Sequence, residues 1–68
     1  LAPGQFLLRL RLQHASYLLK YTSRSITDIA FECGFSSVSY FNRRFKEFSG
    51  HSPTEHRKLS AADAPAKP

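Results

Sequence analysis

Apolar residues in the middle of the chain follow a helical spacing that stops at a glycine. They recur at intervals of three and four residues and place one stripe on a short helix: Ile26, Ile29, Ala30 and Cys33. Ser25 precedes the stripe and is a favourable N-cap, and Asp28 suits the positive end of a helix. Gly34 follows the stripe and fits the left-handed position that ends many helices. The pattern predicts a helix between Ser25 and Gly34.

A second segment with two opposed faces follows, and either Ser36 or Ser37 is its predicted N-cap. Its phenylalanines are spaced i, i+4 and i+7: Phe41, Phe45 and Phe48. Polar residues repeat that spacing on the other side, with an asparagine at the edge: Ser39, Asn42, Arg43 and Lys46. A helix turns about 100° per residue, so the two sets lie nearly back to back. We expect the phenylalanine side to be buried and the polar side to face outward.

The two predicted helices together suggest a helix-turn-helix unit. Ala30 and Gly34 are the small residues of this stretch. Two helices that cross steeply over a short turn need a small side chain where they touch. In a helix-turn-helix the second helix enters the DNA major groove. The pattern therefore indicates an all-α unit and is compatible with a DNA-binding helix-turn-helix, although many small helical domains also have an Ala and a Gly four residues apart.

The flanking segments are predicted to be helical as well. Pro3 suits the first turn of a helix over residues 3–21, whose expected buried face is Phe6, Leu7, Leu10, Ala15, Leu18 and Leu19. Further apolar residues on the same segment predict an exposed apolar patch and self-association at high concentration: Leu8, Leu12, Tyr17 and Tyr21. Ser52 with Glu55 forms a capping-box pattern for a helix over residues 53–59. Residues 60–68 are small, polar and rich in proline, and we expect disorder there.

The motifs extend over most of the chain and resemble the AraC/XylS family of bacterial transcription regulators. The matching runs are R-L-x-x-A-x-x-L-L, S-I-x-x-I-A, G-F-S-S-x-S-Y-F-x-R-x-F-K and G-x-S-P-x-x-x-R, which begin at residues 11, 25, 34 and 50. The resemblance implies a homeodomain-like fold of three to four helices. It divides the chain into a linker helix over residues 1–24, a helix-turn-helix unit with a closing helix over 25–59, and a tail over 60–68. The family usually has an aromatic residue at His56.

The resemblance also implies parts that lie outside this sequence. The family's DNA-binding domain holds two helix-turn-helix units, joined by a long helix, beside a regulatory domain. Residues 2–6 echo residues 52–56, the segment that follows the complete unit. We therefore expect this chain to be the second half of a tandem domain, with the first unit and the regulatory domain as partners. Family members that activate transcription contact RNA polymerase, which makes polymerase a further expected partner.

Charge and composition agree with a DNA-binding domain without requiring one. The 68 residues include ten Lys and Arg against five Asp and Glu, a net charge of +5. This balance favours a polyanionic partner, although a basic surface alone is also common. A single cysteine excludes an internal disulfide and fits a reducing cytoplasm. No apolar run is long enough to span a membrane. We expect a cytoplasmic protein without a cofactor.

The outward face of the second helix supplies the candidate DNA contacts. Arg43 can take guanine O6 and N7 together, and it matches a base-contacting position of the family. Val38 and Ser39 match two further base-reading positions, one suited to a thymine methyl group and the other to several bases. Candidate phosphate contacts are Arg24, Ser37, Asn42 and Lys46. Arg44 could be a rim residue or another phosphate contact. Arg11 matches a frequent family arginine, and we expect a salt bridge to Asp28 or Glu32.

Other chemistries are less well supported by the pattern. The helical spacing of the aromatic residues favours core packing over stacking on unpaired bases: Phe35, Tyr40, Phe41, Phe45 and Phe48. The histidines and Cys33 lack the usual spacing of zinc ligands, so we expect no metal site. No residue set suggests a catalytic centre, and we expect no enzymatic activity. The remaining alternative is a protein-interaction module whose basic helix docks on RNA polymerase or a partner domain.

Overall fold

The computed structural model describes residues 3–63, with side chains described for residues 4–60. It contains four α-helices: α1 (Pro3–Tyr21), α2 (Ile26–Glu32), α3 (Val38–Ser49) and α4 (Pro53–Asp63). No strand occurs within this part of the chain. The all-α prediction and the predicted helix starts after Ser25 and Ser52 are confirmed, and the start predicted after Ser36 or Ser37 lies after Ser37. None of the four helices is both long enough and apolar enough to cross a membrane.

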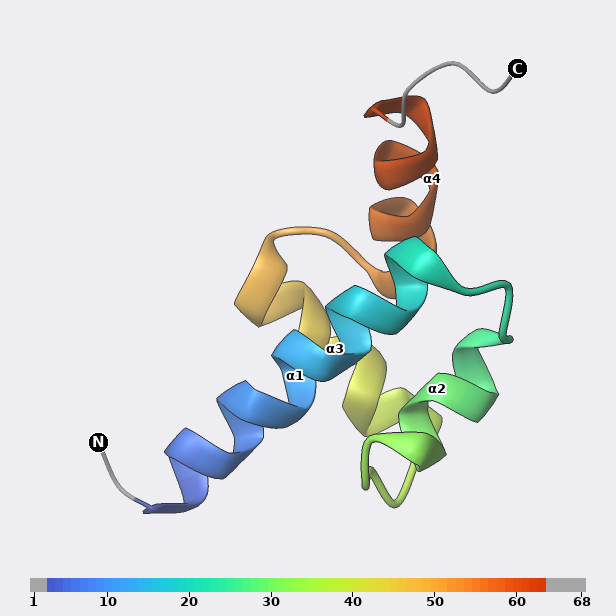
Figure 1. Ribbon diagram of the computed structural model, residues 1–68. Coiled ribbons are helices and arrows are strands. Elements are labelled where there is room, and N and C mark those ends of the chain that lie inside the picture. The colour runs from blue at the N-terminus through green and yellow to red at the C-terminus, as the bar shows by residue number, and fades with distance from the viewer. Residues whose placement is uncertain (1–2, 64–68) are drawn as a thin grey trace.

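The long helix α1 organises the other three. Figure 1 shows α1 as a diagonal rod, with α2 and α3 packed against its C-terminal part and α4 beside its C-terminal end. The N-terminal part of α1 projects beyond the other helices (Figure 1). Both α2 and α3 contact α1, so the helix-turn-helix unit is supported from one side by this helix.

The core consists of a column of aromatic rings surrounded mainly by aliphatic side chains. Phe41 and Phe45 of α3 are fully buried, and their ring centroids lie 5.6 Å apart. Phe35, in the turn before α3, adds a third ring 5.0 Å from that of Phe41. The other members of this hydrophobic cluster come from α1, α2 and the end of α2: Leu12, Ala15, Leu18, Leu19, Ile29, Ala30 and Cys33. Ala30 is completely buried, as expected for a small residue where two helices cross.

The predicted buried face of α1 is wrong in its N-terminal half. Phe6, Leu7 and Leu10 are each about half exposed, whereas Leu12 is only 3% exposed. The reason is that α2, α3 and α4 lie against the C-terminal part of α1 and leave the first turns uncovered. The predicted exposed apolar patch on α1 is confirmed at Tyr17 and Tyr21 but is wrong at Leu12, which is buried, and at Leu8, which packs against the core. Self-association through the exposed residues stays a prediction. Tyr40 and Phe48 of α3 also differ from the expected core positions, because both lie at its edge and remain partly exposed.

The closing helix α4 begins with a reciprocal capping box. The Ser52 N–H donates to Glu55 Oε1 at 3.1 Å, and the Glu55 N–H donates to Ser52 Oγ at 3.2 Å. The hydrogen bond from the Ser52 backbone is the main cause that lowers the pKa of Glu55. The helix continues to Asp63, four residues beyond its predicted end. Disorder was therefore the wrong expectation for residues 60–63, and residues 64–68 lie outside the described part.

Candidate nucleic-acid interface

The turn between α2 and α3 is a helix-ending motif that requires glycine. Gly34 has a φ of 93°, in the left-handed region. Its N–H donates to the Phe31 carbonyl at 3.1 Å, and the N–H of Phe35 donates to the Ala30 carbonyl at 3.0 Å. These two bonds form a Schellman motif, which satisfies carbonyls that the end of α2 leaves open. The turn thus ends α2 sharply and directs the chain into α3.

Serine caps begin both helices of the unit. Ser25 Oγ accepts a hydrogen bond from the N–H of Asp28 at 3.0 Å, and Ser37 Oγ accepts one from the N–H of Tyr40 at 3.0 Å. Ser37, rather than Ser36, is therefore the N-cap of α3. Its side chain is exposed and keeps its own O–H as a donor.

The exposed side of α3 carries the polar residues that the spacing placed there. Four of the predicted contact residues are solvent-exposed: Ser39, Asn42, Arg43 and Lys46. Ser39, Arg43 and Lys46 lie opposite the fully buried Phe41 and Phe45, and Asn42 lies at the edge of this face. Val38 differs, because its side chain is partly buried and packs against the core. The structure thus brings four predicted residues together on one open face and places Val38 at its margin.

The cations of α3 are not equivalent. Arg44 Nη1 lies 2.9 Å from Glu47 Oε1, one turn away on the same helix, and Arg44 is half-buried. Arg44 lines a hollow with residues from the N-terminal half of α1, including Leu8 and Arg9. The two ion pairs found among residues 4–60 include neither Arg43 nor Lys46. These two cations therefore remain free for an external anion.

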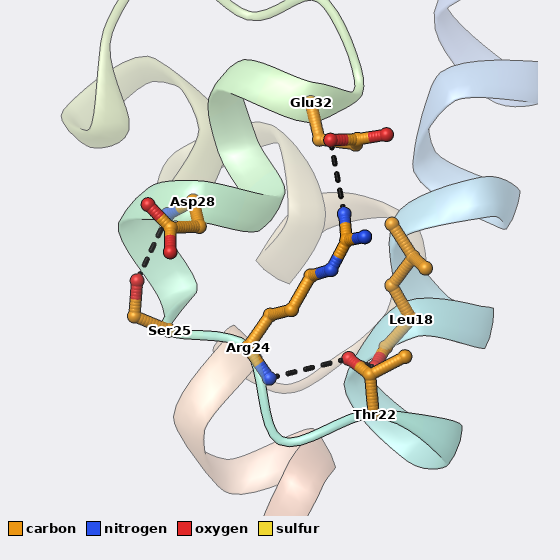
Figure 2. Close-up of polar contacts among 6 residues, drawn as sticks. All are labelled: Leu18, Thr22, Arg24, Ser25, Asp28 and Glu32. Carbon is orange, nitrogen blue, oxygen red and sulfur yellow. Dashed lines mark hydrogen bonds and ion pairs between the residues drawn. The ribbon is translucent and has the colours of Figure 1, made fainter.

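Arg24 is paired within the protein. Its Nη1 atom lies 2.9 Å from Glu32 Oε1, and both side chains are about half exposed. Figure 2 shows the Arg24 side chain extending past α2 toward Glu32, near the C-terminal end of that helix. The backbone N–H of Arg24 also donates to Thr22 Oγ1 at 3.3 Å. Arg24 therefore differs from the exposed residues of α3, because its charge is already paired with Glu32 inside the protein. Its position in the sequence, just before α2, did not reveal this pair.

Arg11 occupies a different place from the one expected. It forms no salt bridge with Asp28 or Glu32 within the described residues, and Glu32 is paired with Arg24 instead. The Arg11 guanidinium instead lies against Gly34. The salt-bridge prediction is therefore wrong, although Arg11 does approach the C-terminal end of α2.

Sequence reasoning missed the two residues that join α4 to α1. Arg57 Nε donates to the Leu19 carbonyl at 3.1 Å, and Arg57 Nη2 donates to the Thr22 carbonyl at 3.1 Å. His56 Nε2 lies 3.0 Å from Ser16 Oγ. The final arginine of the G-x-S-P-x-x-x-R run was the available signal for Arg57. Both residues support the site indirectly by fixing the end of α1, from which the chain enters α2.

Cys33 behaves as a packing residue. Its side chain is buried in the core cluster. Burial, and secondarily the charge of Glu32, raises the pKa of the Cys33 thiol. A thiol that stays protonated is a poor nucleophile. No group of three potential metal ligands lies together within residues 4–60.

Comparisons with known proteins agree with this geometry. A family model described as a helix-turn-helix domain matches residues 1–59. The chain is 46% identical over 61 residues to the HTH-type transcriptional activator RhaR of Klebsiella pneumoniae, covering 90% of this chain and 22% of that protein. The matched region thus spans about a fifth of the length of these curated relatives.

Solved structures show the same arrangement of helices. A transcriptional regulator with an AraC-type DNA-binding domain from Chromobacterium violaceum superposes with a TM-score of 0.89 at 36% identity, over 94% of this chain and 57% of that one. A DNA-binding transcriptional dual regulator from Escherichia coli K-12 gives a TM-score of 0.82 at 39% identity, over 87% of this chain and 53% of that one.

Proposed function

We propose, because this chain belongs to the AraC/XylS family of helix-turn-helix transcription regulators, that its helix α3 enters the major groove of duplex DNA. One observation carries the proposal. The buried phenylalanines and the exposed polar residues of α3 lie on opposite sides, so the polar side is free along the whole helix. An α-helix fits the width of the major groove, and this face offers hydrogen-bond donors and acceptors to base edges.

Base reading is assigned to two residues on the outward face of α3, Ser39 and Arg43, and to Val38 at the margin of that face. Arg43 is exposed and without an internal partner among the described residues, so its fork of donors can bind guanine O6 and N7. Ser39 can bond to several bases, which makes it a tolerant reader. Val38 can touch a thymine methyl group only with the part of its side chain that the core leaves open. Specificity is therefore concentrated at Arg43.

Phosphate contacts hold the helix in register on either side of these readers. Lys46 and Asn42 are exposed on α3, and the free O–H of the Ser37 cap lies at its N-terminal end. Helix N-termini also offer backbone N–H groups to phosphate oxygens. Arg24 can join these contacts only by leaving Glu32. The net charge of +5 adds a general attraction to DNA.

We propose that the whole regulator extends beyond this chain, because the chain spans about a fifth of the length of its curated relatives. Its other proposed parts are a first helix-turn-helix unit in a neighbouring major groove and a regulatory domain. Action in the cytoplasm as an activator that touches RNA polymerase is also proposed, in line with the relative named as a transcriptional activator. The comparisons lend no support to a module that binds protein instead of DNA.

The test is a pair of single-charge variants measured on DNA. Wild-type protein first enriches a preferred duplex from a random pool at low salt. We expect Arg43→Ala to weaken binding to that duplex by about 1–3 kcal/mol. Its affinity for random DNA should fall only by the small amount that the loss of one positive charge causes. Arg9→Ala, on α1, removes the same charge and should cost much less. Equal losses for the two variants on the enriched duplex would contradict base reading by Arg43.

A further inference from the structure

The guanidinium group of Arg11 lies against the glycine of the helix-turn-helix turn. Its Cζ and Nε atoms are each 3.2 Å from the point where a β-carbon on Gly34 would stand, and its Nη2 atom is 3.5 Å from that point. Gly34 therefore serves two purposes, because it adopts a positive φ of 93° and also lets the guanidinium approach the backbone. A side chain of α1 thus touches the turn that separates α2 from α3.

Arg11 leaves α1 from a firmly packed part of that helix. Leu12, the next residue, and Ala15, one turn further, are 3% and 0% exposed. Their burial fixes the rotation of α1 about its own axis. The direction in which the Arg11 side chain leaves the helix is fixed with it. The long side chain then crosses from this backbone to the turn.

The charge of Arg11 complements the end of α2. The last carbonyls of a helix carry a partial negative charge, which a nearby cation stabilises. The last turn of α2 contains no basic residue of its own. The Gly34 turn follows directly, so Arg11 brings a cation from α1 to this end of α2, in addition to Arg24, which pairs with Glu32.

We propose that Arg11 is a positioning residue for α3, which holds the Gly34 turn against α1 and so fixes the direction in which α3 leaves α2. Only residues 35–37 lie between the turn and the first residue of α3. Phe35 is buried and Ser37 is the N-cap, so little slack remains to absorb a movement at Gly34. The consequence for DNA binding rests on the proposed function, whereas the hold on the turn is tested without DNA.

Three variants separate the effect of the positive charge of Arg11 from that of its planar guanidinium group. Arg11→Gln removes the charge and keeps a polar side chain. Arg11→Lys keeps a positive charge at a similar distance without the planar group. Arg9→Gln is the matched control, because it removes the same charge from an exposed position two residues away on α1.

Amide hydrogen exchange tests the hold on the turn. The N–H groups of Gly34 and Phe35 are bonded to carbonyls of α2 and report local opening of the turn. We expect Arg11→Gln to speed their exchange roughly threefold to tenfold relative to the Phe45 amide in the core. Arg11→Lys should restore most of the protection, and Arg9→Gln should leave it unchanged. Equal acceleration at Phe45 would mean that Arg11 contributes only to overall stability, and would overturn the proposal.

Binding to the duplex enriched by wild-type protein tests the consequence. We expect Arg11→Gln to weaken affinity roughly threefold to tenfold more than Arg9→Gln, with recovery in Arg11→Lys. Equal affinities for the Arg11→Gln and Arg9→Gln variants would remove Arg11 from the positioning role. If wild-type protein binds no duplex, the proposed function fails, and the exchange experiment still decides whether Arg11 holds the turn.

Discussion

His56 Nε2 and Ser16 Oγ lie 3.0 Å apart and join α4 to α1 across the part-buried interface of the two helices. The ring of His56 also meets the ring of Phe45 edge-on, with centroids 5.2 Å apart. The family that this chain resembles usually has an aromatic residue at this position. Histidine keeps the aromatic contact and adds a hydrogen bond, so the interface gains a group that can be protonated.

Stability should therefore fall in mild acid. Burial is the main cause that lowers the pKa of His56, and the charges of His51 and Lys20 act in the same direction. As the pH falls through the ordinary histidine pKa of 6.5, His56 takes up a proton in the unfolded chain, whereas in the folded chain it does so only at a lower pH. The free energy of unfolding should thus decrease as the pH falls from 6.5 toward the folded pKa, and this loss should stop below that pKa. Urea unfolding at a series of pH values measures the effect.

A variant isolates the contribution of His56 from those of the other histidines. His56→Phe keeps the edge contact with Phe45 and cannot be protonated. Its unfolding free energy should change less between neutral and mildly acidic pH than that of wild type. Parallel pH profiles for the two proteins would show that His56 does not cause the acid sensitivity.

Arg57 should stabilise the fold more than its partly exposed position suggests. It donates hydrogen bonds to the Leu19 and Thr22 carbonyls at the end of α1. Hydrogen bonds that involve a charged group contribute roughly 1.5–3 kcal/mol, so Arg57→Ala should lower the free energy of unfolding by about that amount. Lys58→Ala, at the exposed next position, should change it by no more than about 0.5 kcal/mol. Denaturant unfolding of both variants makes the comparison.

The aromatic column should be essential for folding. Phe41 is fully buried, and replacing a buried phenylalanine with alanine costs about 3–5 kcal/mol. That amount equals the whole stability expected of a domain this small, roughly 3–5 kcal/mol. Phe41→Ala should therefore be largely unfolded by far-ultraviolet circular dichroism. Phe31→Ala, at a position 54% exposed on α2, should remain helical, and its unfolding would argue against the packing described.

The Arg24–Glu32 pair should limit the access of Arg24 to phosphate. An exposed pair of this kind contributes at most about 1 kcal/mol to stability, so breaking it leaves the fold intact. Glu32→Gln should strengthen DNA binding more than Glu47→Gln, which removes the same charge beside Arg44. Arg24→Gln should reduce the slope of log affinity against log salt by about one.

Two results together would show that Arg24 has only a structural role. The salt slope would be unchanged in Arg24→Gln, and the Glu32→Gln and Glu47→Gln variants would bind DNA with equal affinity. Binding measured by fluorescence anisotropy over a range of salt concentrations gives both quantities.

Features encoded within a few residues could be predicted from the sequence. The caps at Ser25 and Ser52, the left-handed Gly34 and the two faces of α3 depend on spacing and on backbone sterics, and all are present. The open face of α3 follows from the same periodicity, so four of its candidate DNA contacts could be placed on it in advance.

Features that depend on partners distant in the chain could not be predicted in this way. The sequence offers both Arg11 and Arg24 as cations that could pair with Glu32, and only the folded geometry assigns that carboxylate to Arg24. Along α1, Leu10 and Leu12 are equally apolar, and only the place where α2–α4 pack decides that Leu12 is buried. The hydrogen bonds of Arg57 join residues more than thirty positions apart and leave no local pattern.

Backbone amide shifts in a titration with duplex DNA test the central claim most directly. Isotope-labelled protein is titrated at low salt with the duplex that it enriches from a random pool. Groove insertion of α3 predicts that the amides of residues 36–46 shift together, while those in the N-terminal half of α1 stay in place. Shifts that gather on α1, or no shifts at all, would contradict the assignment of α3 as the DNA-reading helix.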